Sequence, residues 1–303
     1  MNIYSASINS KELKRLSALQ PWRTILALAL DWLVIAAAIA ASEYSGSIWV
    51  YLVALVFIGG RMHALGVLVH EAAHFRVLRN RQASEWIMDI FAAWPILATV
   101  DGYRQNHLAH HQNANTEKDP DWIVKFGTAA FTFPQKVRHA ALQLLGYLVA
   151  INSFRDLAQI LPRISKNDRS TRLYKLARFG FYIACAALFT WLGIWKGVLI
   201  YWIVPFFTLF FLFLYVRSVA EHFGSMDYEE ELGSTRTVKP YFWERWFFAP
   251  HHVNYHLEHH LFPGVPFYNL PDLHQALMGD DAYRSKAHVT RGYSTGLVRE
   301  CVG

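Results

Sequence analysis

Cysteine is almost absent from this chain of 303 residues, which contains only Cys185 and Cys301. One lies in an apolar stretch and the other near the C-terminus, so the sequence offers neither a disulfide framework nor a cysteine-based metal site. Basic runs and groove-reading motifs are also missing, which argues against nucleic acid as a partner. Charged residues make up 17% of the chain and hydrophobic residues 53%. That balance excludes an ordinary soluble domain and also a chain lying wholly in lipid.

Four apolar stretches are long enough to cross a bilayer, which takes about 20 helical residues. They cover residues 22–41, 48–68, 177–194 and 197–219. The connection within each pair is short, so we predict two transmembrane hairpins. Basic residues such as Lys14, Arg23 and Arg79 flank the expected inner ends, and the positive-inside rule then puts both termini in the cytosol. The sequence therefore predicts one all-α membrane domain over residues 1–303, with a helical cytosolic cap over about 70–175 and 220–303.

A cleaved signal peptide is the alternative for the first stretch, because Ala38-Ile39-Ala40 resembles a cleavage site. The apolar run is longer than a signal peptide needs, and its removal would break the first hairpin. Residues 84–100 and 134–161 mix apolar and polar positions at helical spacing, and we expect helices lying on the membrane surface there. Pro134 would sit in the first turn of the second of these, and Pro162 just past its end. The net charge of +6 suits an anionic inner leaflet.

Histidine, in contrast to cysteine, is abundant, and most of the 15 histidines fall into three clusters. The clusters are His70 with His74, then His107, His110 and His111, and last His256, His259 and His260. Residues three and four apart share one face of a helix, so each cluster aims its imidazoles in one direction. Imidazole is a good ligand for iron, zinc, copper or nickel. Eight clustered histidines exceed the four ligands of one tetrahedral ion, so we expect two metal ions.

The predicted topology brings these clusters to one side of the membrane. His70 and His74 fall at the inner end of the second span, and His222 falls at the inner end of the fourth. The other clusters lie in the cap. Acidic residues beside them are expected to accept the second N–H of a ligand imidazole, and Asn254 to hold a metal-bound water. The acidic candidates are Glu71, Glu221 and Glu258.

Several polar residues remain open between a supporting role and simple solvated or structural side chains. For the carboxylates of Glu117, Asp119 and Asp121 the two interpretations weigh about equally. His252 lies one turn before His256 and His251 is its neighbour, so contact with the clusters is conceivable for both. The remaining histidines are expected to be structural or exposed, namely His63, His139, His274 and His288.

The three clusters read His-Glu-Ala-Ala-His, His-Leu-Ala-His-His and His-Leu-Glu-His-His, with Arg217-Ser-Val-Ala-Glu-His222 ahead of the last. This combination resembles the membrane fatty acid desaturase and hydroxylase superfamily, and the late motif is similar to its bacterial rhizobitoxine-type branch. The resemblance implies a non-haem di-iron centre that activates O2 and removes hydrogens from an acyl chain. The family's ligands fall on His70, His74, His107, His110, His111, His222, His256, His259 and His260.

The resemblance also implies an external electron donor. The chain contains no His-Pro-Gly-Gly haem box of a fused cytochrome b5 and no flavin or nicotinamide fingerprint. A separate ferredoxin or cytochrome b5 would dock on the basic cytosolic face. The substrate would be a lipid or acyl chain, and the protein would reside in a bacterial inner membrane with its active site cytoplasmic.

Other functions fit parts of the pattern. Hydroxylation or ketolation of a lipid or carotenoid on the same di-iron centre shares the first hydrogen abstraction with desaturation. From a different class, an intramembrane zinc metalloprotease would use His70-Glu71-Ala-Ala-His74, with Glu71 as general base. That interpretation leaves the later histidine clusters without a role. A non-catalytic metal carrier or sensor is a third possibility.

Two charged residues, Asp31 and Arg61, lie inside apolar spans, where charge is costly and usually functional. Counted from the inner ends of their helices, both lie about 12–14 Å deep at 1.5 Å per residue. We expect them to pair across the first hairpin. The alternative is that they flank a substrate tunnel and bind a polar group of the substrate.

Overall fold

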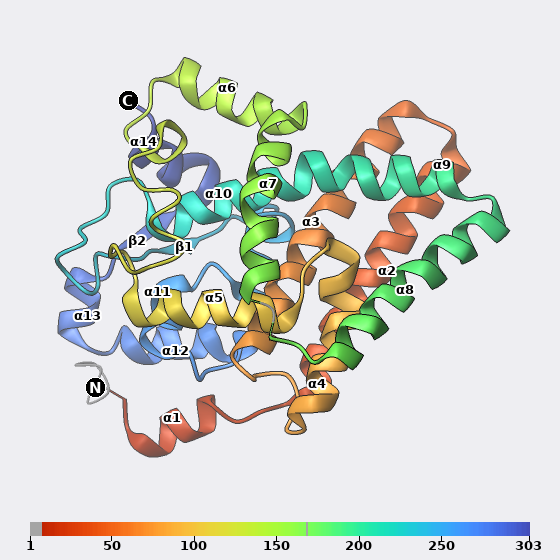
Figure 1. Ribbon diagram of the computed structural model, residues 1–303. Helices are drawn as coiled ribbons and strands as arrows, with labels where there is room; N and C mark the ends of the chain where they lie inside the picture. Colours follow the sequence, from red (N-terminus) through yellow and green to blue (C-terminus); the bar gives the residue numbers. More distant parts are fainter. Residues whose placement is uncertain (1–7, 168) are drawn as a thin grey trace.

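The computed structural model describes residues 8–167 and 169–303 and is mostly helical (Figure 1). Two short parallel strands, β1 (Thr237–Lys239) and β2 (Val289–Arg291), pair in register Thr237 to Val289. The predicted helical character is thereby confirmed. The α-helices are α1 (Ser10–Leu16), α2 (Pro21–Ser45), α3 (Ile48–Ala73), α4 (Arg81–Met88), α5 (Val100–Asn113), α6 (Val137–Leu148), α7 (Ile151–Asn167), α8 (Arg172–Leu192), α9 (Trp195–Val198), α10 (Phe211–His222), α11 (His256–Leu261), α12 (Leu270–Leu277), α13 (Asp281–Lys286) and α14 (Val298–Cys301).

Four helical stretches are long and apolar enough to cross a membrane, and each overlaps one of the predicted spans. They are Ser10–Ser45, Ile48–Ala73, Arg172–Leu192 and Trp195–His222. The second continues past the predicted end at residue 68, because its polar last turn is buried in protein rather than exposed to lipid. The fourth joins α9 and α10 through two π-helical segments, Leu199–Ile203 and Phe206–Phe210, on either side of Pro205. Such wide turns are expected where a proline interrupts the helical hydrogen bonds.

The surface of these helices is typical of contact with lipid. No residue of α8 is buried, and its apolar side chains are exposed: Phe179 and Ile183 expose 64% and 53% of their surfaces. On α2, Leu30 and Leu33 expose 48% and 62%. A soluble protein rarely leaves so much contiguous apolar surface in water. The chain is therefore an integral membrane protein by the length, composition and exposure of its long helices.

The segments expected to lie on the membrane surface differ from the predicted single helices. Residues 84–100 form α4, a π-helical turn Asp89–Ala93 and a 3-10 turn Trp94–Ile96 that contains Pro95. The prediction of one helix over 134–161 was wrong, because the chain turns at Ala150, where φ is 65°, and divides into α6 and α7. Pro162 lies inside α7 rather than past its end.

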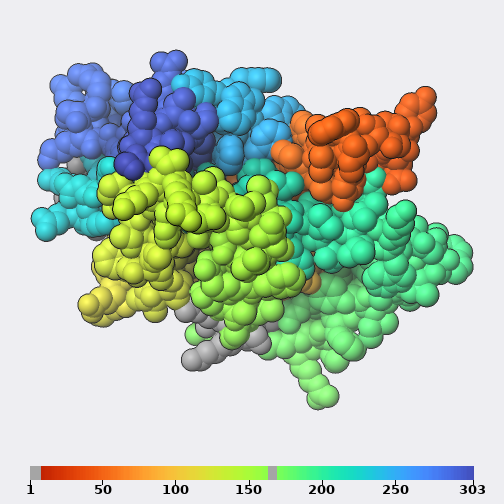
Figure 2. Space-filling view, turned by 90° about the horizontal axis from the view of Figure 1, so that it is seen from above, coloured from red at the N-terminus to blue at the C-terminus, as the bar shows by residue number. Residues whose placement is uncertain are grey.

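The inner half of α3 forms the centre of the molecule. From Ile58 to Ala73 every residue except Gly66 is buried. Elements packed around it include α2, α5, the π-helical segments Asp89–Ala93 and Phe206–Phe210, and a short turn at Pro250–His252. This enclosure also covers polar side chains of the inner half, among them Arg61, His63 and Glu71. Figure 2 shows the C-terminal segments on one side of the molecule and the turn between α2 and α3 on the other.

Asp31 on α2 and Arg61 on α3 form an ion pair inside the protein. Arg61 Nη1 lies 3.0 Å from Asp31 Oδ1, and the two side chains expose only 9% and 2% of their surfaces. The other Asp31 oxygen lies 2.7 Å from His251 Nε2. The second Arg61 nitrogen donates to the carbonyl oxygen of Trp246. Both charges are thus paired and hydrogen-bonded, which is the condition for burying them.

Removing one partner of this pair leaves the other charge buried and unpaired. We expect Asp31→Asn or Arg61→Gln alone to lower the free energy of unfolding by about 3–5 kcal/mol. The double variant should regain part of that loss, because neither charge remains. Thermal unfolding in detergent measures the three variants, and Lys14→Gln on the exposed face of α1 is the control. If the decrease in the free energy of unfolding of the double variant equals the sum of the two single decreases, the two side chains do not stabilise each other.

Candidate metal centre

Four helices carry the nine predicted histidines to one place. The last turn of α3 supplies His70, and His74 is the residue that ends this helix. Three come from α5, one from the end of α10, and three from α11. Those residues are His107, His110 and His111 on α5, His222 on α10, and His256, His259 and His260 on α11. Helix ends and one short helix therefore converge on a single site.

The imidazoles divide into two adjoining sets. The first consists of His70, His74, His107, His111 and His259, and the second of His110, His222, His256 and His260. Within each set the ligand nitrogens lie within 4.8 Å of one another. The rings of His111 and His260 stack at a centroid distance of 4.3 Å, and they join the two sets.

The ring nitrogens face each other as ligands of a shared cation would. In the first set, His107 Nε2 lies 2.8 Å from His74 Nε2 and 3.1 Å from His111 Nε2. In the second, His256 Nε2 lies 2.8 Å from His222 Nε2. One nitrogen cannot donate to all its neighbours, so proton sharing alone does not satisfy such a group. Both ring nitrogens of His70 are also buried without a hydrogen-bond partner. The donor set therefore fits metal ions, which accept lone pairs from several imidazoles at once.

Burial lowers the pKa of most of these imidazoles. Together with nearby cationic or imidazole side chains, it lowers the pKa of His74 to about 4 and the pKa of His111 to about 2. Burial likewise holds the pKa of His107, His256, His259 and His260 well below the usual value. A neutral imidazole is the form that binds a metal ion. The site is thus ready to bind metal at neutral pH.

Arg104 fixes α5 against the end of α3. Its guanidinium donates to the carbonyl oxygens of Ala72 and Ala73, both at 3.1 Å, and lies 2.5 Å from Glu85. The last carbonyls of a helix have no partner within the helix, and a basic side chain satisfies them. This contact sets the position of α5, and hence of His107, relative to His74.

Asp119 supports His110 from the loop that follows α5. His110 Nδ1 lies 2.8 Å from one Asp119 oxygen, which also accepts the N–H of Asn115 at 3.0 Å. The other oxygen accepts the N–H of Asp121 at 2.8 Å. Burial alone would raise the pKa of this carboxyl, but the hydrogen bonds outweigh it and lower the pKa. The structure thus separates three acidic residues that the sequence left equal, since Glu117 is exposed and Asp121 instead accepts from Asn106.

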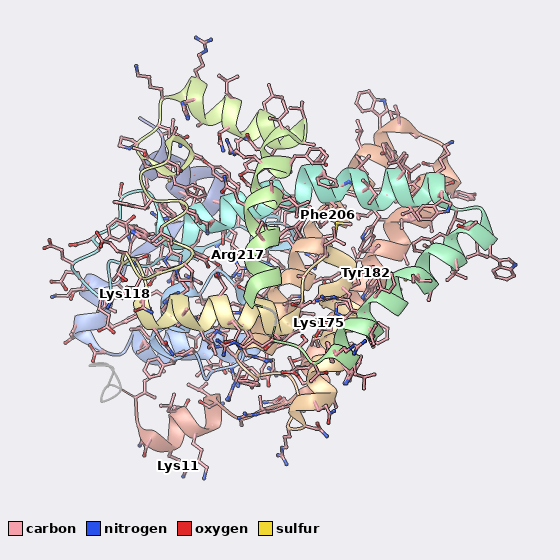
Figure 3. All side chains as sticks on the ribbon, viewed as in Figure 1. Lys11, Lys118, Lys175, Tyr182, Phe206 and Arg217 are labelled. Carbon is pink, nitrogen blue, oxygen red and sulfur yellow. The ribbon has the colours of Figure 1, made fainter. Side chains whose placement is uncertain are left out.

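The other predicted supporting residues differ in what they contact. Glu221 lies 3.3 Å from His256 Nδ1 and accepts from Arg217, which Figure 3 labels near the middle of the molecule. Glu71 lies 3.5 Å from His70 Nδ1 and accepts the N–H of Phe267 at 3.0 Å.

Among the described residues, no side-chain hydrogen bond or ion pair joins Glu258 or Asn254 to one of the nine histidines. Glu258 is fully buried and is bound by Thr237, His274 and Tyr283, so it anchors α11. The side-chain N–H of Asn254 donates to the Val238 carbonyl at 2.9 Å and so joins this segment to β1.

Two contacts were not predicted from the sequence. Asn115 Oδ1 lies 3.1 Å from His222 Nδ1, and its amide donates to the Ser234 carbonyl at 2.8 Å. Its φ of 59° is a left-handed conformation that asparagine tolerates well. The sequence alone offered no signal of this contact. Tyr103 stacks on His107 at 5.2 Å.

Asp31 and Arg61 lie beside the site rather than in it. A small cavity of about 10 Å³ borders His70, His256, His259 and His251. Asp31 holds His251 at the cavity wall. His251 therefore contacts the ion pair on one side and lines the same cavity as three of the clustered histidines on the other.

Comparison with known proteins agrees with this geometry. A family model described as fatty acid desaturase matches residues 46–292. The chain belongs to the fatty acid desaturase family. Dihydrorhizobitoxine desaturase of Bradyrhizobium elkanii is 30% identical over 94% of this chain and 84% of the relative. The expected resemblance to the rhizobitoxine-type branch is confirmed.

The names of two more distant relatives describe them as lipid desaturases. The sn-1 acyl-lipid omega-3 desaturase (ferredoxin) of Nostoc sp. (strain 36) is 23% identical over 84% of this chain and 76% of the relative. The sn-1 oleoyl-lipid 12-desaturase of Anabaena variabilis is 22% identical over 72% of this chain and 66% of the relative. The family membership and the two histidine sets together indicate an oxidoreductase with a metal site.

Asp119 provides a test of the supporting contacts. Asp119→Asn keeps the size of the side chain but removes the charge that strengthens His110 as a ligand. We expect metal affinity to fall about 10–100-fold, the usual effect of losing such a partner. Elemental analysis after dialysis against graded chelator measures the bound metal. Glu117→Gln on the same loop is the matched control, and an equal loss in both variants would contradict the special role of Asp119.

Proposed function

We propose that this protein is an O2-dependent desaturase that introduces a double bond into a fatty acyl or related lipid-like chain. The observation that carries the proposal is the pair of adjoining imidazole sets, joined at His111 and His260. All nine histidines would hold two iron ions, and Asp119, Asn115 and Glu221 would orient them. A zinc protease needs only the first His-Glu-x-x-His motif and gives no reason for the second set.

The implied metal sets the chemistry. Bound iron can use O2 to oxidise an unactivated C–H bond, which redox-inert zinc cannot do. The protein's own residues bury most of the imidazoles and fix their directions. In desaturation, two hydrogens leave neighbouring carbons of the substrate. Two external electrons and two protons complete the reduction of O2 to water.

The membrane arrangement follows from the four long helices. We propose that α2 with α3, and α8 with the helical stretch Trp195–His222, form two transmembrane hairpins of a single domain over residues 1–303. Both termini, the cap and the metal centre would then face the cytoplasm of a bacterial cell, at the inner membrane. The support is the basic residues near the inner ends of the spans and their scarcity in the outer turns. An acyl substrate reaches such a site from the lipid without crossing bulk water.

Electrons would come from a separate one-electron carrier. Two relatives carry ferredoxin in their names, and a ferredoxin is therefore the favoured donor, with a cytochrome b5 type protein as the alternative. The net charge of +6 would favour the approach of an acidic carrier. Neither flavin nor nicotinamide motifs occur in the chain, so it does not supply these electrons itself.

The test is the product formed in cells. Mass spectrometry of lipids and small metabolites, with and without the protein, should show a product lighter than its precursor by about two mass units. The variant His260→Ala should abolish this product. His139→Ala is the matched control, because His139 is exposed on α6 and belongs to neither set. A gain of about sixteen mass units would identify a hydroxylase on the same centre and contradict desaturation.

Iron content gives a test that does not need the substrate. We expect about two iron ions per wild-type chain and a substantial loss of iron in His111→Ala, because this ring belongs to one set and stacks on the other. His139→Ala should retain the wild-type content. Protein that binds zinc and no iron under iron-replete, reducing conditions would contradict a di-iron enzyme.

A further inference from the structure

One segment of the cap lies deep beside the second span. The chain from Tyr241 to Val253 follows the inner half of α3, although the sequence predicted it to be cytosolic. The Trp246 carbonyl accepts from Arg61, and the Phe247 carbonyl lies 2.9 Å from His63 Nδ1. Figure 2 shows the light-blue atoms of this part of the chain directly beside orange atoms of the second span.

A glycine permits this close approach. A Cβ atom added at Gly60 would lie 3.0 Å from the Phe247 ring and 3.2 Å from the Trp246 carbonyl oxygen. Further out along α3, the Phe57 ring contacts the Phe247 ring at a centroid distance of 5.3 Å. The segment therefore packs against α3 over more than one helical turn, with its backbone at the helix surface.

The ends of α2 set the depth of this contact. The charged residues Arg23 and Glu43 flank its apolar stretch, and the rise along the helix from one to the other is about 30 Å, the thickness of the hydrocarbon core. Asp31 is eight residues inside Arg23, or about 12 Å. Arg61 lies level with Asp31, since the two side chains form an ion pair. The Trp246 carbonyl, which accepts from Arg61, thus lies about 12 Å inside the level of Arg23.

The outer face of the segment carries three aromatic side chains and one exposed cation, Arg245, whose long side chain can extend toward the headgroups. Phe242, Trp243 and Trp246 expose 81%, 48% and 41% of their surfaces. Side chains of this size are normally buried, and a cluster of them on one side of a polar domain marks an interaction surface. At the depth of Asp31 the surrounding medium is acyl chain, which suits these side chains.

Irregular backbone is tolerated in the hydrocarbon core only where its polar groups find partners in the protein. Glu244 meets this need inside the segment. It is fully buried, and its carboxylate accepts the N–H of Tyr241 at 2.8 Å and the N–H of Ser294 at 2.7 Å. Arg61 and His63 bind two of the carbonyls. The same requirement explains why α3 carries polar side chains in the middle of an apolar span.

We propose that residues 241–253 form a re-entrant segment and that Phe242, Trp243 and Trp246 contact the acyl chains of the leaflet nearest the histidine clusters. The inference rests on the membrane arrangement in the proposed function, but not on its chemistry. The occupant of this surface is lipid rather than a protein partner, because its depth places it below the headgroups.

Site-directed spin labelling tests the proposal on the full-length protein in lipid nanodiscs. The two native cysteines are replaced by Cys185→Ala and Cys301→Ala, and Phe242→Cys then carries a nitroxide. Collision with O2, which concentrates in lipid, is compared with collision with a water-soluble nickel chelate. Ile183→Cys, exposed in the middle of α8, gives the lipid reference, and Ser285→Cys on α13 gives the water reference.

We expect the label at residue 242 to resemble the lipid reference, with nickel accessibility several-fold below that at residue 285. Trp243→Cys provides a second position if the first variant does not fold, as judged by its elution as a single species and its metal content. Accessibility like that of residue 285 in a folded variant overturns the inference. If residue 183 is also accessible to nickel, the membrane arrangement of the proposed function fails as well, so the two failures are distinguishable.

Discussion

The structure depends on bringing nine imidazoles face to face on four helices. Most of the rings are buried, and their nitrogens lie about 3 Å from other nitrogens, as for His107 and His74 at 2.8 Å. Such an arrangement is unfavourable unless a cation binds the lone pairs. The long central helix α3, the cap of Arg104 on its last carbonyls and the buried Glu258 all hold the rings in this arrangement.

The polar residues inside the apolar spans have one physical origin. A charge in the hydrocarbon core is costly, so Asp31 and Arg61 are paired, and each also binds a group from the C-terminal segment. His63 binds a further carbonyl of that segment. Helices α2 and α3 are therefore joined to the C-terminal segment by polar contacts, in addition to the apolar packing around α3.

The sequence predicted the spans and the histidine clusters well, because both follow from local periodicity. Apolar runs of sufficient length and the three- and four-residue spacing of histidines need no knowledge of the tertiary fold. The sequence did not predict contacts between segments that lie far apart along the chain. Nothing in the sequence separates Asp119 from Glu117, or pairs Asn115 with His222 across more than a hundred residues. The break of the helix at Ala150 also lacks a glycine or proline to mark it.

The two imidazole sets share their helices. α5 gives His107 and His111 to one set and His110 to the other, and α11 gives His259 to the first set and the remaining two to the second. An ion bound in either position immobilises both helices and so pre-organises the ligands of its neighbour. Under the proposed di-iron function, loading of the centre is cooperative, and partly filled protein is a minor species. Scarce iron would then yield a mixture of empty and complete centres rather than half-loaded ones.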